Sequence, residues 1–207
     1  VVGGLLAVRQ RDIKRLLAYS SIGQVGYIVV GLGLGTPLGL AGALFHLVNH
    51  AVCKSLLFLD AGAVERAAGT RDLQELGGLG RVIPVASRTS LIASLSISGV
   101  PPFGGFWSKL LIVVACIEAG HLGLAIAAVL FSVVTLGYQL RLQRGCFDRP
   151  APVPAARVVA GTPPLMAAPM VALSLLCIGM GLLAIPGLAQ PLGIAPAVAV
   201  LAKGVWG

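Results

Sequence analysis

Three titratable residues lie four positions apart in one apolar stretch of the chain: His46, His50 and Lys54. A helix turns by about 100° per residue, so this spacing places the three side chains on one face, within an arc of about 80°. Imidazole titrates near neutral pH, and burial disfavours the charged form of a lysine, so all three can gain and lose a proton. Packing against neighbouring helices is the alternative role. Because ionisable groups are costly in lipid, we favour a proton path.

A fourth titratable residue, Lys109, follows a segment that cannot form a continuous helix. That segment combines prolines, which lack amide donors, with flexible glycines: Gly99, Pro101, Pro102, Gly104 and Gly105. Free backbone carbonyls within a membrane are tolerated only inside protein or beside water. We expect the helix to resume near Phe106, so that Lys109 lies in its first turn, where the helix dipole disfavours positive charge. A proline kink with packing value is the alternative to a proton-carrying lysine.

Other polar residues offer support for these four. Ser20, Gln24 and Tyr27 share a face of the first long apolar stretch, where packing is the favoured role and ordering of water along the path is the alternative. Asp60 points about 120° away from Lys54 on the same helix. We expect Asp60 either to counter a charge on a neighbouring helix or to be solvated at the membrane surface. Ser108, adjacent to Lys109, is a further supporting candidate.

The sequence holds no pattern for a cofactor, a metal or covalent catalysis. Its cysteines lie at 53, 116, 146 and 177, without the short spacings of metal or iron–sulfur sites. Glycine-rich nucleotide loops in a strand-to-helix context, zinc-protease motifs and nucleophile elbows do not occur. We therefore expect no catalytic residue, metal or cofactor in this chain. Cys53 and Cys177, inside apolar runs, are expected to act as small hydrophobic residues.

The elements that must position these residues are membrane-spanning helices. Of 207 residues, 57% are hydrophobic and 11% are charged, whereas soluble domains carry about 25% charged residues. Five stretches reach the roughly 20 residues needed to cross a bilayer. They follow an N-terminal stub at 1–8 and cover 16–35, 37–64, 83–117, 121–141 and 166–186. The prediction is an all-α integral membrane protein of about five transmembrane helices plus the stub, one helix being broken at Pro101-Pro102.

Basic residues gather in alternate connections between these stretches. Twelve of the fifteen Lys and Arg residues lie in the first, third and fifth connections, whereas the connections at 34–38 and 117–121 contain none. By the positive-inside rule the basic side is cytoplasmic. We therefore predict a multi-pass protein of the cell inner (plasma) membrane, with Cys146 facing the cytoplasm and the C-terminus outside.

Three long strings, ordered along the chain, resemble a known family. They run from Arg11 to Gln24, from Phe45 to Leu59 and from Gly99 to Lys109. They resemble the antiporter-like subunits shared by respiratory complex I (NADH:quinone oxidoreductase), energy-converting membrane-bound hydrogenases and Mrp Na⁺/H⁺ antiporters. Members of that family contain two inverted five-helix repeats, and the resemblance places this chain on the second, as a C-terminal fragment.

The resemblance implies a division of the chain and roles for its titratable residues. Residues 1–145 would be the second repeat, truncated at its start, 146–165 a proline-rich cytoplasmic linker, and 166–207 an additional transmembrane helix with an apolar tail. Lys109 would be the protonatable residue of the broken helix. His46, His50 and Lys54 would belong to the hydrophilic axis that passes protons toward it. The essential glutamate and lysine of the first repeat have no counterpart here.

The favoured function is therefore that of a proton-translocating subunit of an energy-converting oxidoreductase, coupled to electron transfer in partner subunits. The alternatives are a component of an Mrp-type Na⁺/H⁺ antiporter without a redox partner, and a truncated product without activity. The expected partners are other membrane subunits of a multisubunit complex, the lipid bilayer, and protons or Na⁺. The composition excludes nucleic-acid binding.

Overall fold

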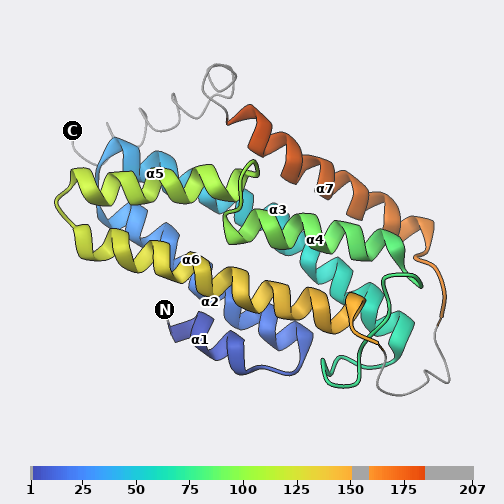
Figure 1. The fold of residues 1–207 in the computed structure, drawn as a ribbon. Helices are drawn as coiled ribbons and strands as arrows, with labels where there is room; N and C mark the ends of the chain where they lie inside the picture. Colours follow the sequence, from blue (N-terminus) through green and yellow to red (C-terminus); the bar gives the residue numbers. More distant parts are fainter. Residues whose placement is uncertain (1, 151–158, 185–207) are drawn as a thin grey trace.

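The computed structural model describes residues 2–150 and 159–184, and in this part of the chain the regular structure is helical. Seven α-helices and one π-helical turn follow one another (Figure 1). They are α1 (Val2–Arg9), α2 (Ile13–Gly33), α3 (Pro37–Ala68), α4 (Pro84–Ser98), α5 (Gly104–Glu118), α6 (Leu122–Gln143), the π-helical turn η1 (Arg144–Asp148) and α7 (Pro164–Leu183).

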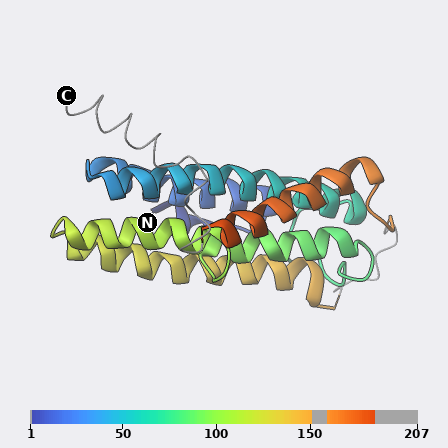
Figure 2. The same cartoon turned by 90° about the horizontal axis from the view of Figure 1, so that it is seen from above.

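The long helices lie side by side along one common direction, and α4 and α5 follow each other end to end (Figures 1 and 2). Among the described residues, α2, α3, α6 with η1, and α7 are each long and apolar enough to cross a membrane. Helices α4 and α5 have 15 residues each, so neither is long enough to cross alone, and end to end they match the expected broken helix. The predicted all-α membrane fold with one broken helix is confirmed.

Local capping signals explain where α2 begins and where α3 begins and ends. The Asp12 side chain accepts a hydrogen bond from the amide of Arg15 at 2.9 Å, which starts α2. Thr36 caps α3 in the same way, and a proline occupies the first turn of that helix. Helix α3 ends at Gly69, whose φ of 71° is accessible to glycine without steric cost.

The three basic connections meet at one end of the bundle. The amide of Ile13 donates to the carbonyl of Arg71 at 3.1 Å, which joins the first connection to the third. Arg149 donates to the carbonyl of Gln74 at 2.8 Å, which joins the fifth connection to the third. The connections at 34–36 and 119–121 lie at the opposite end (Figure 1). The alternation inferred from the basic residues therefore agrees with the fold.

The helix break lies where the prolines require it, but α5 begins earlier than the sequence suggested. Helix α4 ends at Ser98, and α5 begins at Gly104 rather than near Phe106. Lys109 is therefore the sixth residue of α5 and lies in its second turn, so the expected first-turn position is wrong. The physical reason is that a helix can start two residues after the second proline, with Phe103 as its N-cap, because its first-turn amides need no intrahelical partner.

Close packing accounts for the two glycines that begin α5, whereas Gly99 ends α4 with a φ of 86°, a conformation that favours glycine. A Cβ atom added to Gly105 would lie 1.7 Å from the carbonyl oxygen of Ser96, so only glycine allows this approach of α5 to α4. A Cβ atom on Gly104 would lie 2.9 Å from the side-chain oxygen of Asn49 on α3. The break is therefore a tightly packed junction between α3, α4 and α5.

Helix α7 packs into the same bundle, although the sequence treats it as an addition to the repeat. Met170 and Cys177 are fully buried within the main apolar core, and the Sγ atoms of Cys177 and Cys53 lie 3.6 Å apart. Gly181 lies against the break, since a Cβ atom there would be 2.2 Å from the carbonyl oxygen of Pro102. Residues 151–158 of the predicted linker and the tail from 185 onward lie outside the described residues.

The thiol of Cys146 lies at the basic end but is only 1% exposed, because it packs into the main apolar core beside Phe147. The expectation that Cys146 faces the cytoplasm therefore needs correction. Its backbone lies at the basic end, for which the cytoplasmic side stays a prediction, but its side chain is buried. Exposed positions at the two ends of the bundle are better reporters of orientation.

We predict that a Gln74→Cys variant, in a background without the native cysteines, is labelled by an impermeant maleimide only from the cytoplasmic side of oriented vesicles. Gln74 is exposed in the third connection, which carries basic residues. His121→Cys, in the exposed connection at the opposite end, is the matched control and should be labelled only from the outside. Labelling in the reverse sense would overturn the assigned orientation.

We also predict that Gly105→Ala lowers the stability of the protein by at least about 1–3 kcal/mol, the usual cost of overpacking a core. Gly137→Ala on α6 is the control, because a Cβ atom there meets nothing within 4 Å. Thermal unfolding in detergent, followed by circular dichroism, compares the two variants. Equal midpoints would show that the break does not depend on this close approach.

Candidate functional site

Buried polar side chains from four helices lie inside the bundle and are here called the polar axis. Its members are at most 6% exposed. They comprise Ser20 and Gln24 on α2, His46 and Lys54 on α3, Ser108 and Lys109 on α5, and Thr135 on α6. Buried polar groups are expensive unless they are hydrogen-bonded, so their partners decide what each can do.

Lys54 is held by helix α2. Its Nζ donates to the carbonyl oxygen of Leu17 at 2.9 Å and to the hydroxyl of Ser20. The hydroxyl of Ser20 in turn donates to the carbonyl of Leu17 at 2.8 Å. Ser20, for which the sequence favoured a packing role, therefore contacts the titratable lysine directly.

His46 bridges α2 and α5 through both ring nitrogens. Its Nε2 lies 3.2 Å from Oε1 of Gln24, and its Nδ1 lies 2.9 Å from Oγ of Ser108. Thr135 donates its own proton to the carbonyl of Phe131, so its oxygen is free to accept from Nε2 of Gln24 at 3.3 Å. The amide oxygen of Gln24 therefore faces His46, and Nε2 of His46 must carry a proton.

This assignment gives Ser108 two alternative acceptors. A neutral His46 has its free lone pair on Nδ1, so the Ser108 hydroxyl donates to it. When the ring is doubly protonated, Nδ1 donates instead, and the Ser108 hydrogen turns to the carbonyl of Gly105, 3.2 Å away. The protonation state of His46 thus sets the hydrogen bond at the start of α5.

Lys109 closes the helix break. Its Nζ donates to the carbonyl oxygens of Ile97 at 2.9 Å and Ser98 at 3.3 Å. In an uninterrupted helix these carbonyls would accept from the amides of residues 101 and 102, and both are prolines without an amide hydrogen. The lysine ammonium therefore replaces two missing backbone donors, and no carboxylate pairs with it among the described residues.

Tyr27 lies between His46 and Lys109. The Lys109 Nζ is 4.8 Å from the centre of the Tyr27 ring, and the Tyr27 and His46 ring centres are 5.4 Å apart. The Tyr27 hydroxyl donates to the carbonyl of Ala128 at 2.6 Å, which fixes the ring against α6. The ring face can stabilise a positive charge on Lys109. The sequence placed Tyr27 on a packing face and missed this position.

His50 does not join the hydrogen-bonded network of the described residues. Its Nε2 is buried without a partner there, as is Nδ2 of Asn49 on the same helix. The side-chain oxygen of Asn49 accepts from Ser96 on α4 at 3.2 Å. The stripe of His46, His50 and Lys54 shares a helix face as predicted, but side chains one turn apart do not contact each other directly and need water to connect them.

Asp60 has neither of the two environments that the sequence suggested. It is 2% exposed, so it is not solvated at the surface, and no cation pairs with it in the described part of the chain. Its Oδ1 accepts a hydrogen bond from Thr89 on α4 at 2.7 Å. The predicted countercharge role would have required a Lys or Arg on the facing helix, and a threonine is there instead.

The sequence also missed the contributions of α4 and α6. Helix α6 carries Thr135, Gln139 and Gln143 at four-residue spacing, and all three are buried. Ser94 on α4 donates to Gln139 at 3.4 Å, which connects the two helices. The sequence does carry a signal for this polar face, because the spacing of the three residues is the same as in the His46 stripe. Neutral side chains, unlike ionisable ones, do not by themselves indicate a proton path.

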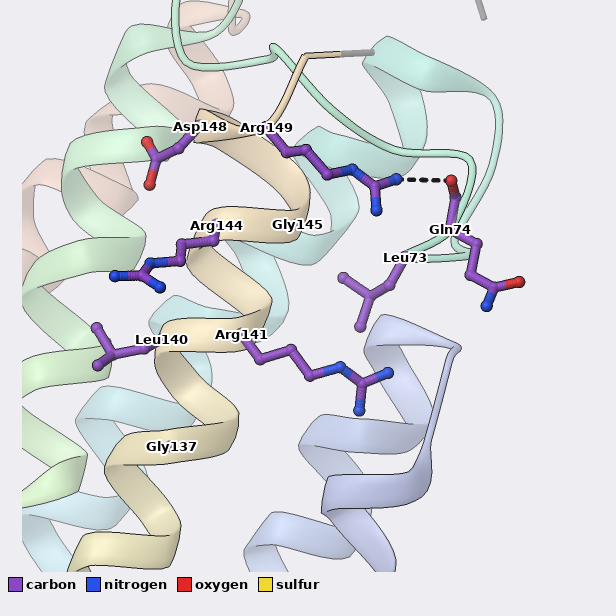
Figure 3. Close-up of a pocket in the computed structure, with 9 residues that line it drawn as sticks. All are labelled: Leu73, Gln74, Gly137, Leu140, Arg141, Arg144, Gly145, Asp148 and Arg149. Carbon is purple, nitrogen blue, oxygen red and sulfur yellow. Dashed lines mark hydrogen bonds between the residues drawn. The ribbon is translucent and has the colours of Figure 1, made fainter. Parts of the chain in front are cut away.

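A recess of about 820 Å³ lies at the basic end, and no residue of the polar axis lines it. Its lining includes Arg141, Arg144 and Arg149 (Figure 3). Arg141 and Arg149 extend toward α2 and the third connection, whereas Arg144 points the other way. Because these side chains do not converge, the recess does not form a binding centre. No group of three or more potential metal ligands occurs among the described residues.

Comparison with known proteins gives matches over most of this chain. The family model described as "NADH:quinone oxidoreductase/Mrp antiporter, TM" matches residues 1–135. NADH-quinone oxidoreductase subunit N of Desulforudis audaxviator is 40% identical over 162 residues, which cover 78% of this chain and 32% of that protein. The chain thus spans about a third of the length of this relative.

Two solved membrane complexes contain chains of the same fold. A chain of the Mrp complex from Dietzia sp. matches with a TM-score of 0.86 and 27% identity, over 100% of this chain and 47% of its own. A chain of respiratory complex I from Thermus thermophilus matches with a TM-score of 0.84 and 27% identity, over 99% of this chain and 42% of its own. With the family model covering well over half of its residues, the chain belongs to the NADH:quinone oxidoreductase/Mrp antiporter transmembrane family.

Proposed function

We propose that this chain forms the second-repeat half of a proton path in an energy-converting oxidoreductase, assembled with other membrane subunits in the plasma membrane, its basic end in the cytoplasm. The observation that carries the proposal is the position of Lys109, whose ammonium is buried at a helix break without a carboxylate partner in the described chain. An ionisable group placed there is a functional candidate by default. The oxidoreductase assignment is supported by the subunit N relative and the complex I chain.

The positions of the titratable residues along the polar axis suggest the order in which a proton moves from Lys54 to Lys109. Lys54, in the middle of α3, receives a proton from the side of the basic end, and His50 and His46 connect it to α5 through water. His46 passes the proton toward Lys109, which lies beyond the Tyr27 ring. Loss of the Lys109 proton weakens its hold on the carbonyls of Ile97 and Ser98, so proton transfer and the packing of the break are coupled.

The second candidate is a component of an Mrp-type Na⁺/H⁺ antiporter, favoured by the similarity to the Mrp complex chain. Both functions use the same polar axis and differ in what drives it. Inverted membrane vesicles with an acridine pH probe separate them. Quenching on addition of NADH, H₂ or formate, lost when the gene is deleted, supports the oxidoreductase. Dequenching by NaCl after an imposed pH gradient, lost in the same deletion, supports the antiporter.

We predict that Lys109→Arg lowers proton transport by at least about tenfold, the scale expected for loss of a proton-transferring group. Arginine keeps the positive charge and can still donate to the carbonyls, but it does not release its proton near neutral pH. Lys109→Met should be equally inactive. The measurement is proton uptake into inverted vesicles at equal amounts of assembled protein.

Lys14→Arg is the matched control, because Lys14 forms a half-exposed ion pair with Glu65 at the basic end, outside the polar axis. This variant should transport normally. Full transport by Lys109→Arg would show that a fixed charge suffices at this position, and the proposed proton-carrying role would then be wrong.

A further inference from the structure

A small cavity lies between α2, α3, α4 and α6, toward the basic end of the bundle, and two of its lining residues have polar atoms without partners. The cavity has a volume of about 10 Å³, and its lining includes Asp60 on α3 and Ser90 on α4. Oδ2 of Asp60 and Oγ of Ser90 are buried, and neither has a hydrogen-bond partner in the described part of the chain. The two residues are 2% and 1% exposed.

The cavity is suited to one water molecule. A water needs at least about 10–15 Å³, and it needs two or more polar partners. Oδ2 of Asp60 and Oγ of Ser90 provide two partners. The other lining side chains are apolar apart from one thiol, at Cys146. A water here would satisfy two groups whose burial without partners is costly.

A hydrogen bond fixes the carboxyl group of Asp60, but no cation in the described part of the chain pairs with it. Its Oδ1 accepts from Thr89, which fixes the carboxyl group. Without a cation partner among the described residues, burial favours the neutral carboxylic acid over the carboxylate. A carboxylic acid with its proton on Oδ2 is a donor toward the cavity.

The same cavity adjoins the anchor of Lys54. Leu17 lines the cavity, and its carbonyl oxygen accepts from the Lys54 Nζ at 2.9 Å. Leu57, one helical turn after Lys54, also lines it. Val64, which lies one turn after Asp60 toward the basic end of α3, also lines the cavity. The cavity therefore lies between the polar axis and the basic end.

We propose that Asp60, Ser90 and a water molecule between them form a proton-loading site that supplies Lys54 from the cytoplasm. In the transfer, the O–H bond of the Asp60 carboxylic acid breaks and its proton goes to the water. Lys54 does not line the cavity, so a second water beside the carbonyl of Leu17 relays a proton from the first water to the neutral amine of Lys54, where a new N–H bond forms. The Asp60 carboxylate then takes a proton from the cytoplasmic side. This site rests on the proposed function, because it supplies the same path.

The first test is Asp60→Asn in the full-length subunit, assembled in its native membrane. The amide oxygen still accepts from Thr89 and the volume is unchanged, but the amide cannot release a proton. Proton uptake into inverted vesicles should fall at least about tenfold at equal assembly. Asp148→Asn is the control, because Asp148 is an exposed acid at the same end that does not line this cavity. It should transport normally.

A second variant keeps the carboxyl group and removes the water. Ser90→Val fills the cavity and deletes one polar partner, so it should reduce uptake as Asp60→Asn does. Infrared spectra supply a readout other than activity. The C=O stretch of a buried carboxylic acid that shifts in D₂O should be present in the wild type and in Ser90→Val, and absent in Asp60→Asn.

Lys54→Met, measured beside these variants, separates the two proposals. If Lys54→Met is inactive while Asp60→Asn and Ser90→Val transport normally, the loading site is wrong and the proposed function stands. If Lys54→Met also transports normally, the proposed path through Lys54 fails as well. Absence of the carboxylic acid band from the wild type would overturn the loading site irrespective of transport.

Discussion

The hydrogen bonds from Lys109 to the carbonyls of Ile97 and Ser98 are the interaction on which the centre of this bundle depends. Two consecutive prolines leave these carbonyls without amide donors at a depth where free backbone acceptors are not tolerated. A side chain from the following half-helix provides the replacement. The lysine can reach back only because Gly105 lets α5 approach the carbonyl of Ser96 closely. Helix α7 then covers the junction, with Gly181 against the carbonyl of Pro102.

This arrangement gives a buried lysine a structural task that depends on its proton. In the described chain the ammonium is stabilised by backbone dipoles and by the face of Tyr27, and not by a carboxylate. A salt bridge would hold the charge in place, whereas dipoles and a ring face hold it less firmly. Ser108, one residue earlier, lies between His46 and the carbonyl of Gly105. Under the proposed function, the titration of His46 and of Lys109 would therefore act on the same turn of α5.

At the basic end of the bundle, a layer of charged connections covers an apolar region that contains a buried acid. Its connections carry most of the basic residues, and hydrogen bonds from backbone amides and from the Arg149 side chain join them into one layer. The residues beneath this layer are largely apolar, and Asp60 is the acid buried among them in the described chain. An acid buried there, between a charged surface and the first lysine of the polar axis, is in the position that a proton donor to Lys54 would need.

Several features of this protein follow from the sequence alone, because they depend on neighbouring residues. The apolar stretches, the basic connections and the Pro101-Pro102 interruption set the helices, their alternation and the break, through local rules of hydropathy and backbone donors. The shared face of His46 and Lys54 follows from helical periodicity.

Periodicity does not determine how each helix is rotated against its neighbours. Only the tertiary structure decided that Lys54 binds the carbonyl of Leu17, that Ser108 meets His46 and that Asp60 faces Thr89 and not a cation. These partners lie 29 to 62 residues apart in the chain, and close packing between helices, which has no local sequence signal, brings them together.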